Sequence, residues 1–454
     1  MKKFLVCIVC ICIFAFCFSG CSSEEEIVLN VFNWGEYISD GEDEWVYIDE
    51  ETGEEITIPY LDINAAFEEY YFEKYAKRVR VNYTTYASNE EMYAKLITSD
   101  ASFDVIVPSE YIIPLLIQNN LIQPINLENI PNYVNIGEQY VIDGVSFVEN
   151  DGEKTFYSAT YTFGKVAIIY NLTRLEELFE DFDQEAFEAE GWNVLWNEKY
   201  ASAGTLQFNN SRDAFASAQF LLANQDGVSA SEYINASVTD SKDKFDAAFS
   251  LLAQQKPLIQ KYVMDEVFNK METGNACIAP YYVGDFFTMY ANSEDELCCF
   301  FPNQGSNSFC DAMCVPTSAR NPEIAEEYIN FLLSTNEDPT KSIAEINSEY
   351  ICYATPNKAV QDSKYYQYYV ENEMHPDAFE MLYSENSFDF ENEGFVSLDD
   401  ETQRYLNGLW DSLKIQEDET DIILPSICAS LAGVITVWLI FLGLRKKHRS
   451  RFYD

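Results

Sequence analysis

The side chains of this chain that could do chemistry are mainly carboxylates and aromatic rings. Its 454 residues include 76 Asp and Glu against 28 Lys and Arg, a formal net charge of −48, with 31 Tyr and 32 Phe. Carboxylates and ring faces are the groups that hold organic cations. Most of the charges serve solubility and most of the rings serve the core, so we expect only a few of each in a site.

Residue types suited to catalysis are scarce. The body holds a single histidine, His375, which precedes Pro376 and which we place in a loop. No nucleophile motif, metal-ligand spacing or phosphate-binding glycine loop is present, so we expect no enzyme activity, no metal and no cofactor. Paired carboxylates could serve glycoside hydrolysis, an alternative that predicts turnover of a sugar. The acidic surface excludes nucleic acid as a partner, because it repels phosphates.

Both ends of the sequence predict attachment to a membrane. Basic residues and the apolar residues 4–18 precede Cys21, which predicts a lipoprotein signal peptide over 1–20 with Cys21 lipidated. An uncleaved signal anchor is the alternative. Residues 422–444 carry no charge and are long enough to span a bilayer as a helix. The basic residues 445–454 predict a cytoplasmic tail, and therefore a body on the extracytoplasmic face.

Strand and helix patterns alternate along the body, and they must position any site. Strands are predicted at 28–33, 79–85, 103–107, 204–208 and 277–282. Helices are predicted at 63–75, 89–97, from Ser109 onward, and at 175–182, 211–224, 245–255 and 324–333. The acidic residues 41–60 read as an inserted hairpin, and 155–171 as one long strand passing between two domains. Alternation and length predict a two-domain α/β fold with a mainly parallel sheet.

The body cysteines lack metal-ligand spacing and lie in apolar runs. We expect buried free thiols, with one or two disulfides as the alternative. These cysteines are Cys277, Cys298, Cys299, Cys310, Cys314 and Cys352.

Four blocks of sequence, in order, resemble the spermidine/putrescine-binding proteins of polyamine ABC transporters. The blocks are residues 33–37 (NWGEY), 84–96 (TTYASNEEMYAKL), 103–111 (FDVIVPSEY) and 353–357 (YATPN). The similarity extends over about residues 27–415. It implies a type II periplasmic-binding-protein fold, in which hinge crossovers join two lobes that close over a ligand. It also implies delivery of spermidine or putrescine to an ABC permease and ATPase complex. The acidic insert and the C-terminal membrane helix depart from the family pattern.

On this basis the chain is divided into seven parts. These are the signal peptide 1–20, a first α/β lobe 21–163 with the insert 41–60, a second α/β lobe 164–310, a return to the first lobe 311–345, the C-terminal part of the second lobe 346–418, the transmembrane helix 422–444, and the cytoplasmic tail 445–454.

The resemblance also implies which residues line the ligand site. Asp311 is expected to hold an ammonium group, and Tyr282 and Phe309 stand where the family has larger rings. Asn210 stands where the best-known members have an acid, and Glu110 where members often have a neutral residue. The implied polyamine-binding residues are Trp34, Glu36, Tyr37, Ser109, Tyr111, Asn210, Asp213, Tyr282, Phe309, Asp311 and Tyr353.

Several of these residues also have a purely structural interpretation. Trp34 could belong to the core. Ser109 could cap a helix, and Asn210 with Asp213 resembles a capping box at the start of the helix at 211–224.

Polyamine chemistry requires several such groups to act together. A charge-assisted hydrogen bond contributes roughly 1.5–3 kcal/mol, an ammonium over a ring roughly 0.5–2 kcal/mol, and four buried methylenes about 3 kcal/mol. Association costs roughly 4–15 kcal/mol, so acids and rings must converge from both lobes. The sequence leaves open the choice between spermidine and putrescine. It also leaves open a different cationic or neutral solute, and a membrane-tethered sensor ectodomain.

Overall fold

One sheet runs through the whole molecule. The computed structural model describes residues 26–49, 52–98, 102–384 and 387–415. Within them, ten strands form a sheet of order β11-β10-β12-β9-β14-β5-β1-β4, with β13 paired to β9 and β6 to β14. Its strands are β1 Ile27–Trp34, β4 Val79–Tyr86, β5 Val105–Ile106, β6 Ile122–Gln123, β9 Ser158–Asn171, β10 Thr205–Phe208, β11 Ile259–Val263, β12 Ile278–Tyr282, β13 Leu297–Phe300 and β14 Ser308–Pro316. Separate hairpins are β2 Glu44–Ile48 with β3 Glu55–Pro59, and β7 Phe147–Asn150 with β8 Glu153–Phe156.

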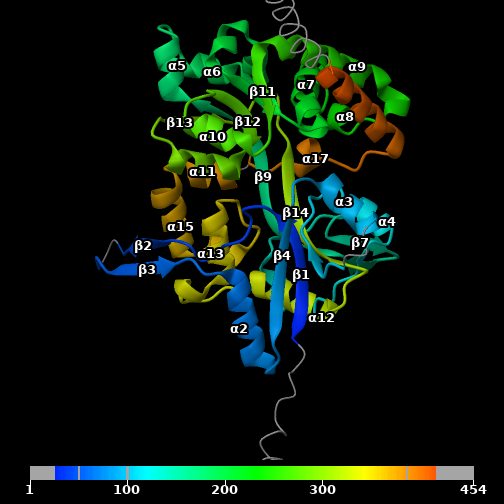
Figure 1. Cartoon of the computed structure of the whole chain (residues 1–454), viewed down its shortest axis with the longest axis vertical. Helices are drawn as coiled ribbons and strands as arrows, with labels where there is room; N and C mark the ends of the chain where they lie inside the picture. Colours follow the sequence, from blue (N-terminus) through cyan, green and yellow to red (C-terminus); the bar gives the residue numbers. More distant parts are fainter. Residues whose placement is uncertain (1–25, 50–51, 99–101, 385–386, 416–454) are drawn as a thin grey trace, which may run out of the picture.

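The sheet has two parallel sets joined by two long antiparallel strands. We call β5-β1-β4 the β1 half and β11-β10-β12 the β10 half. Strands β9 and β14 pair with each other and run through both halves (Figure 1). Because β9 is antiparallel to β12 and β14 to β5, the carboxyl ends of the two halves face each other. Ligands of α/β proteins bind outside the carboxyl ends of parallel strands, so this geometry locates the candidate site.

Helices cover both halves of the sheet (Figure 1). The α-helices are α2 Ile63–Tyr75, α3 Asn89–Thr98, α4 Ile113–Gln118, α5 Leu172–Leu178, α6 Gln184–Ala189, α7 Ser211–Asp226, α8 Ser231–Ile234, α9 Val238–Gln255, α10 Glu266–Glu272, α11 Val283–Asn292, α12 Pro322–Leu332, α13 Ile343–Ile351, α14 Lys358–Gln361, α15 Lys364–Tyr369, α16 Ala378–Tyr383 and α17 Phe390–Glu393. Residues 400–415 are also helical. Of these described helices, none combines the length and apolar character needed to cross a bilayer.

Local capping explains why the predicted helices begin where they do. Ser88 accepts a hydrogen bond from the N–H of Glu91 at 3.1 Å, which confirms it as the cap of α3. Asn210 caps α7 by accepting the N–H of Asp213 at 2.8 Å, and α7 ends at Gly227 in the left-handed conformation. The helix predicted from Ser109 was placed wrongly. It begins at Ile113, and its cap position has no side-chain hydrogen bond.

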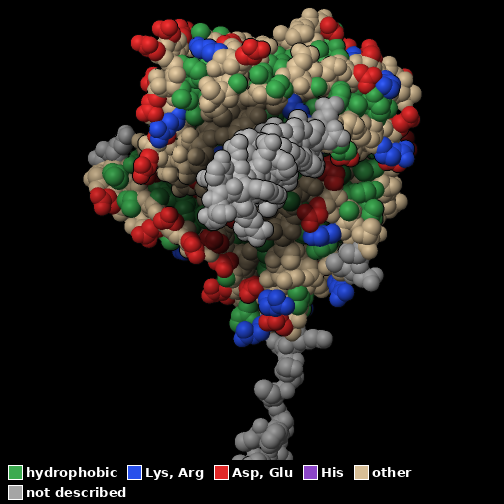
Figure 2. Space-filling model, turned by 45° about the horizontal axis from the view of Figure 1, so that its top comes forward, with side chains coloured by type: hydrophobic (Ala, Val, Ile, Leu, Met, Phe, Trp, Pro, Cys, Tyr) green, Lys and Arg blue, Asp and Glu red, His purple; other side chains and the backbone are tan. Residues whose placement is uncertain are grey.

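The acidic insert forms the predicted hairpin, β2–β3, which projects from the body in Figure 1. Its inner face carries Trp45, which packs against the ring of Tyr369 at 5.1 Å. The indole N–H of Trp45 donates to Glu349 Oε2 on α13 at 3.0 Å. In Figure 2, acidic side chains gather along the flank on the side of this projection.

The segment predicted as the C-terminal part of the second lobe, residues 346–418, contacts both halves of the sheet. Helix α15 packs against β2 and α13, beside the β1 half. Further on, Trp410 packs on Tyr262 of β11 with ring centroids 5.0 Å apart. The strand predicted at 155–171 is β9, and Tyr157 separates it from β8. The division into lobes remains a proposal.

Some predictions lie outside the described residues. They are the signal peptide, the lipidated Cys21, the transmembrane helix 422–444 and the tail 445–454. All six body cysteines lie within the described residues and are free thiols.

Candidate ligand-binding site

The predicted site residues follow the carboxyl ends of four parallel strands. Trp34 ends β1 and Tyr37 follows it, whereas Ser109 lies just after β5. In the β10 half, Asp213 lies in the first turn of α7 after β10, and Tyr282 ends β12. The sheet therefore brings residues from distant parts of the chain to the region where its two halves face each other.

Asp311 on β14 accepts hydrogen bonds from the hydroxyl groups of Ser109 and Tyr37. Together with these two residues and Thr162, which supports Tyr37, it forms what we call the Asp311 cluster. Ser109 donates to its Oδ1 at 2.6 Å, and Tyr37 donates to its Oδ2 at 2.8 Å. The hydroxyl of Thr162, which is opposite Asp311 in the β9–β14 ladder, lies 2.5 Å from that of Tyr37. Because the hydroxyl hydrogen of Tyr37 is already donated to Asp311, the hydroxyl of Thr162 is the donor in its hydrogen bond with Tyr37.

The Asp311 cluster presents a fixed negative charge in a desolvated place. The residue is 5 % exposed, and burial raises the pKa of Asp311 to about 6 against the lowering effect of Ser109 and Tyr37. The carboxyl is ionised at neutral pH and has little water around it. Such a charge attracts a cation that can replace the missing solvent.

Asp213 forms a second acidic point in the β10 half; with Asn210 and Tyr282 it makes up the Asp213 cluster. Its Oδ2 accepts from Asn210 Nδ2 at 2.7 Å and from the hydroxyl of Tyr282 at 3.2 Å. Burial raises the pKa of Asp213, and both hydrogen bonds oppose the shift. The capping-box interpretation is thus correct for the Asn210 cap, and the carboxyl of Asp213 still lies beside a predicted ring.

A continuous row of four rings connects the two clusters. The centroid of Tyr282 lies 5.3 Å from that of Phe309, Phe309 lies 6.3 Å from Tyr353, and Tyr353 lies 5.2 Å from Tyr37. Tyr282 bonds to Asp213 at one end, and Tyr37 bonds to Asp311 at the other. The predicted residues therefore form one arrangement, with carboxylates at the ends and ring faces between them.

Two glycines leave the space that these rings occupy. A Cβ added to Gly164, opposite Phe309 in the β9–β14 ladder, would lie 2.8 Å from Phe309 Cζ. A Cβ added to Gly284 would lie 2.5 Å from ring atoms of Tyr353. Both distances are shorter than carbon atoms tolerate, so the positions of the rings depend on these glycines.

Three predicted residues lie outside both this row and the two acidic clusters. The indole N–H of Trp34 donates to the carbonyl of Val107 at 2.9 Å, and the ring packs on Tyr86, so Trp34 is half-buried and held within the β1 half. Glu36 is exposed, with a left-handed φ of 51°. Tyr111 is half-buried, and its hydroxyl accepts from the side chain of Asn89 at 3.0 Å.

Comparison with known proteins identifies the family. A family model for bacterial extracellular solute-binding proteins matches residues 65–374. The chain belongs to this family. It is 28% identical over 302 residues to the spermidine/putrescine-binding periplasmic protein of Salmonella typhimurium, covering 66% of this chain and 77% of that protein. It is 21% identical over 350 residues to the putrescine-binding periplasmic protein PotF of Escherichia coli, covering 75% and 80%.

Solved structures agree on the fold. The TpPotD lipoprotein of Treponema pallidum matches with a TM-score of 0.59 and 20% identity, over 85% of this chain and 99% of that one. These comparisons confirm the α/β periplasmic-binding-protein fold and the resemblance found in the four sequence blocks. Members of this family bind solutes and are not classed as enzymes, and the body of this solute-binding protein lies outside the cytoplasm.

Sequence reasoning missed two polar groups of the site. Thr162 supports Tyr37, and its position on a strand of alternating small and aromatic residues gave no functional signal. Asp285 lies in the first turn of α11, where burial raises its pKa to about 7 against the lowering effect of a hydrogen bond from Tyr353. It lies three residues after Tyr282, the residue that immediately precedes α11, and that spacing was the available signal.

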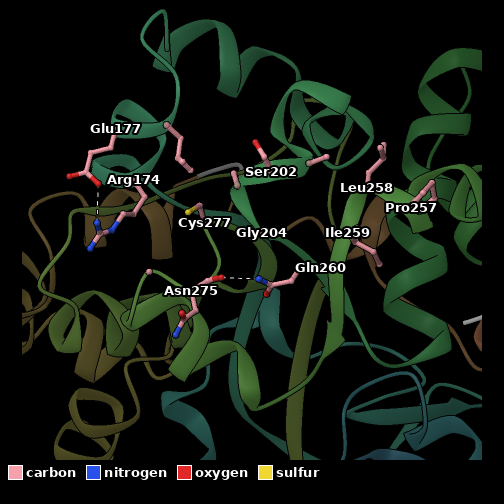
Figure 3. A pocket seen from close by; sticks show the side chains of 14 residues that line it. Arg174, Glu177, Ser202, Gly204, Pro257, Leu258, Ile259, Gln260, Asn275 and Cys277 are labelled. Atoms are coloured by element: carbon pink, nitrogen blue, oxygen red, sulfur yellow. Dashed lines mark hydrogen bonds and ion pairs between the residues drawn. The ribbon is translucent and has the colours of Figure 1, made fainter. Parts of the chain in front are cut away.

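A separate cavity of about 500 Å³ lies at the opposite, amino ends of β10, β11 and β12. Figure 3 shows Arg174 pointing to Glu177, and Gln260 to Asn275, in its wall. Arg174 is engaged by Glu177 at 2.9 Å and by Asp295 at 2.8 Å. None of the predicted site residues lines this cavity. We therefore place the candidate ligand site of this solute-binding protein between the facing strand ends.

Proposed function

We propose that this solute-binding protein captures a polyamine such as spermidine or putrescine and delivers it to an ABC permease and ATPase complex. The observation that carries the proposal is the row of four rings with a carboxylate at each end. A polyamine has the complementary form, because ammonium groups end an apolar methylene chain. Charge-assisted hydrogen bonds suit its ends, and ring faces suit both the chain and the cationic groups.

The relatives support the same ligand class. Their names include both spermidine/putrescine-binding and putrescine-binding periplasmic proteins. The formal net charge of −48 supports the proposal more weakly, since it raises the local concentration of any cation. An amino acid ligand would need a group for its carboxylate, whereas the Asp311 and Asp213 clusters both present acids.

Calorimetry of the full chain in detergent tests the proposal. Putrescine, spermidine, spermine and a set of amino acids are titrated in turn, with Mg²⁺ as a control for attraction by net charge alone. We expect dissociation constants of about 1 µM or below for at least one polyamine, equivalent to roughly −8 kcal/mol. Binding of amino acids alone, or equal binding of Mg²⁺ and polyamines, would refute it.

Gly164→Ala is expected to weaken polyamine binding by about 2- to 30-fold, since the added methyl displaces the ring of Phe309 and a cation–ring contact is worth roughly 0.5–2 kcal/mol. Calorimetry measures the affinity, and circular dichroism checks the fold. Gly408→Ala is the matched control, because a Cβ there meets nothing within 4 Å. Equal affinities for the two variants would contradict the importance of the ring position.

The mode of membrane attachment is also a proposal. We propose that a lipid on Cys21 and a helix over residues 422–444 hold the body at the outer face of the membrane, where a permease can reach it. Mass spectrometry of the membrane-extracted protein checks both, because a lipid-modified peptide begins at Cys21 and a retained helix leaves the tail 445–454 detectable. An unmodified Cys21 in an intact N-terminus would refute the lipid anchor.

A further inference from the structure

Glu110 is a buried acid next to Asp311 that the proposed binding does not use. It is fully buried, and its Oε2 accepts the backbone N–H of Cys310 at 3.0 Å. Its backbone N–H in turn donates to the carbonyl of Cys310 at 2.8 Å, which ties Glu110 to the strand beside Asp311. Its Oε1 has no hydrogen-bond partner among the described residues. An ionised oxygen without a donor is strongly disfavoured in such a place.

The hydrogen bonds decide which of the two neighbouring acids carries the negative charge. Each oxygen of Asp311 accepts from a hydroxyl, whereas Glu110 receives one backbone N–H and has one bare oxygen. Two carboxyl groups in one buried region resist ionising together, and donors favour the charged form. The geometry therefore puts the charge on Asp311 and a proton on Glu110. In agreement, burial and the charge of Asp311 hold the pKa of Glu110 well above its usual range.

Titratable groups on two other elements interact electrostatically with Glu110. On β14 they are Asp311 and the buried thiol of Cys310, whose pKa burial raises so that it stays neutral. On α7, the guanidinium of Arg212 lowers the pKa of Glu110. Burial lowers the pKa of Arg212 to about 10, which leaves it charged at neutral pH. Cys310 and Arg212 thus keep their charge states, and a cation bound at Asp311 alters the field at Glu110 by neutralising the charge of Asp311.

We propose that Glu110 carries a proton in the unliganded protein and releases it to solvent when a ligand ammonium neutralises Asp311. The inference rests on the proposed function, since it needs a cation at Asp311. The O–H bond of Glu110 breaks, its carboxylate remains, and the ammonium of the ligand keeps all its protons. The ligand charge cancels the repulsion from Asp311 and joins Arg212 in stabilising the ionised form. Glu110 is a positioning residue in this role, because it acts through Asp311.

Calorimetry of the full chain counts the released protons. Putrescine and spermidine are titrated at pH 7.5 in two buffers of different ionisation enthalpy, for wild type, Glu110→Gln and Glu349→Gln. We expect wild type to release a measurable fraction of one proton per ligand. Glu110→Gln should release fewer protons than wild type, because Asp311, with a pKa of about 6, is already ionised, and any proton from Asp285, whose pKa is about 7, is released by both proteins alike. Glu349→Gln removes another fully buried acid, on α13, and should keep the wild-type proton count.

The pH profile of affinity gives a second readout that a merely structural role would not move. Between pH 7 and 8.5 the affinity of wild type should rise, with Glu110 contributing at most about tenfold per pH unit for its one proton, and the affinity of Glu110→Gln should rise less steeply because it lacks this contribution. The side-chain oxygen of Gln can still accept the N–H of Cys310, and Gln has nearly the same shape as Glu, so this substitution preserves the local structure. Equal proton counts or parallel pH profiles for the two proteins would overturn the role of Glu110.

Infrared spectroscopy separates this inference from the proposed function. In the unliganded proteins at pH 7.5, subtracting the spectrum of Glu110→Gln from that of wild type should leave the carbonyl band of a protonated carboxylic acid. Binding of putrescine or spermidine to wild type should remove the carbonyl band of a protonated carboxylic acid. This second measurement needs no variant. Absence of the first band overturns the protonated state of Glu110. Failure of both amines to bind overturns the proposed function. The comparison of the unliganded wild type with Glu110→Gln stays valid in that case, because it involves no ligand.

Discussion

Asp311→Asn is expected to weaken polyamine binding by about 30-fold to several thousand-fold. Removing one member of a buried, hydrogen-bonded charge pair costs about 2–5 kcal/mol, which corresponds to this factor. The effect is large because Ser109 and Tyr37 hold the carboxylate in one orientation and only 5 % of the residue meets solvent. Calorimetry with putrescine and spermidine measures the loss.

The same substitution is not expected to destabilise the unliganded protein at pH 7. Burial raises the pKa of Asp311 to about 6, above its value of about 3.9 in an unfolded chain. Because the pKa of Asp311 is higher in the folded protein than in the unfolded chain, its contribution to stability is largest below about pH 3.9. That contribution is lost as the pH rises through about 6. Asn carries no charge to bury, so the melting temperature of the Asp311→Asn variant at pH 7 should equal or exceed that of wild type.

Asp240→Asn is the control for net charge, because it removes one exposed acid in the first turn of α9 that belongs to neither acidic cluster. Its polyamine affinity should match that of wild type. If Asp311→Asn and Asp240→Asn bind equally well, the acidic character of the whole surface explains binding, and the role of the Asp311 cluster is wrong.

Lys165→Met is expected to lower the free energy of unfolding by about 3–5 kcal/mol, because it leaves the carboxylate of a buried ion pair without its partner. Lys165 lies on the crossing strand β9, and its Nζ is 2.5 Å from Glu393 Oε2 of α17, with side chains 7% and 12% exposed. The pair fastens the C-terminal segment to the strand that runs through both halves of the sheet. Chemical denaturation followed by circular dichroism measures the change.

Two further variants show that the effect comes from an unpaired buried charge. Lys165→Met combined with Glu393→Leu removes both charges and should recover most of the stability, since apolar replacements of a whole buried pair are close to neutral. Lys261→Met breaks an exposed pair with Glu266, and should cost at most about 1 kcal/mol. If Lys165→Met lowers the free energy of unfolding by as little as Lys261→Met does, the proposed effect of an unpaired buried charge is wrong.

Local sequence determined most of the secondary structure. The helix expected at 63–75 is α2, because the apolar Ile63, Phe67 and Tyr71 share one buried face and Asp62 caps the first turn. The hairpin in the acidic insert and the Asn210 cap of α7 likewise depend on residues a few positions apart. Where a segment is short and apolar, the local pattern failed: the residues after Ser109 form a turn before α4, and the Ser109 hydroxyl binds Asp311 instead of capping a helix.

The sequence by itself also determined the family and the chemical types in the site. Its motif blocks predict the fold, and its acids and rings predict a cationic ligand. Only the tertiary structure decided which of them meet. Tyr37 and Asp311 are 274 residues apart, and their hydrogen bond exists because β9, β14, β5 and β1 adopt one register. The same register of strands explains three other features. It brings Thr162 to Tyr37, leaves one oxygen of Glu110 without a hydrogen-bond partner among the described residues, and holds Trp34 inside the β1 half. Sheet register is settled by burying apolar faces along whole strands, and no short stretch of sequence contains that information.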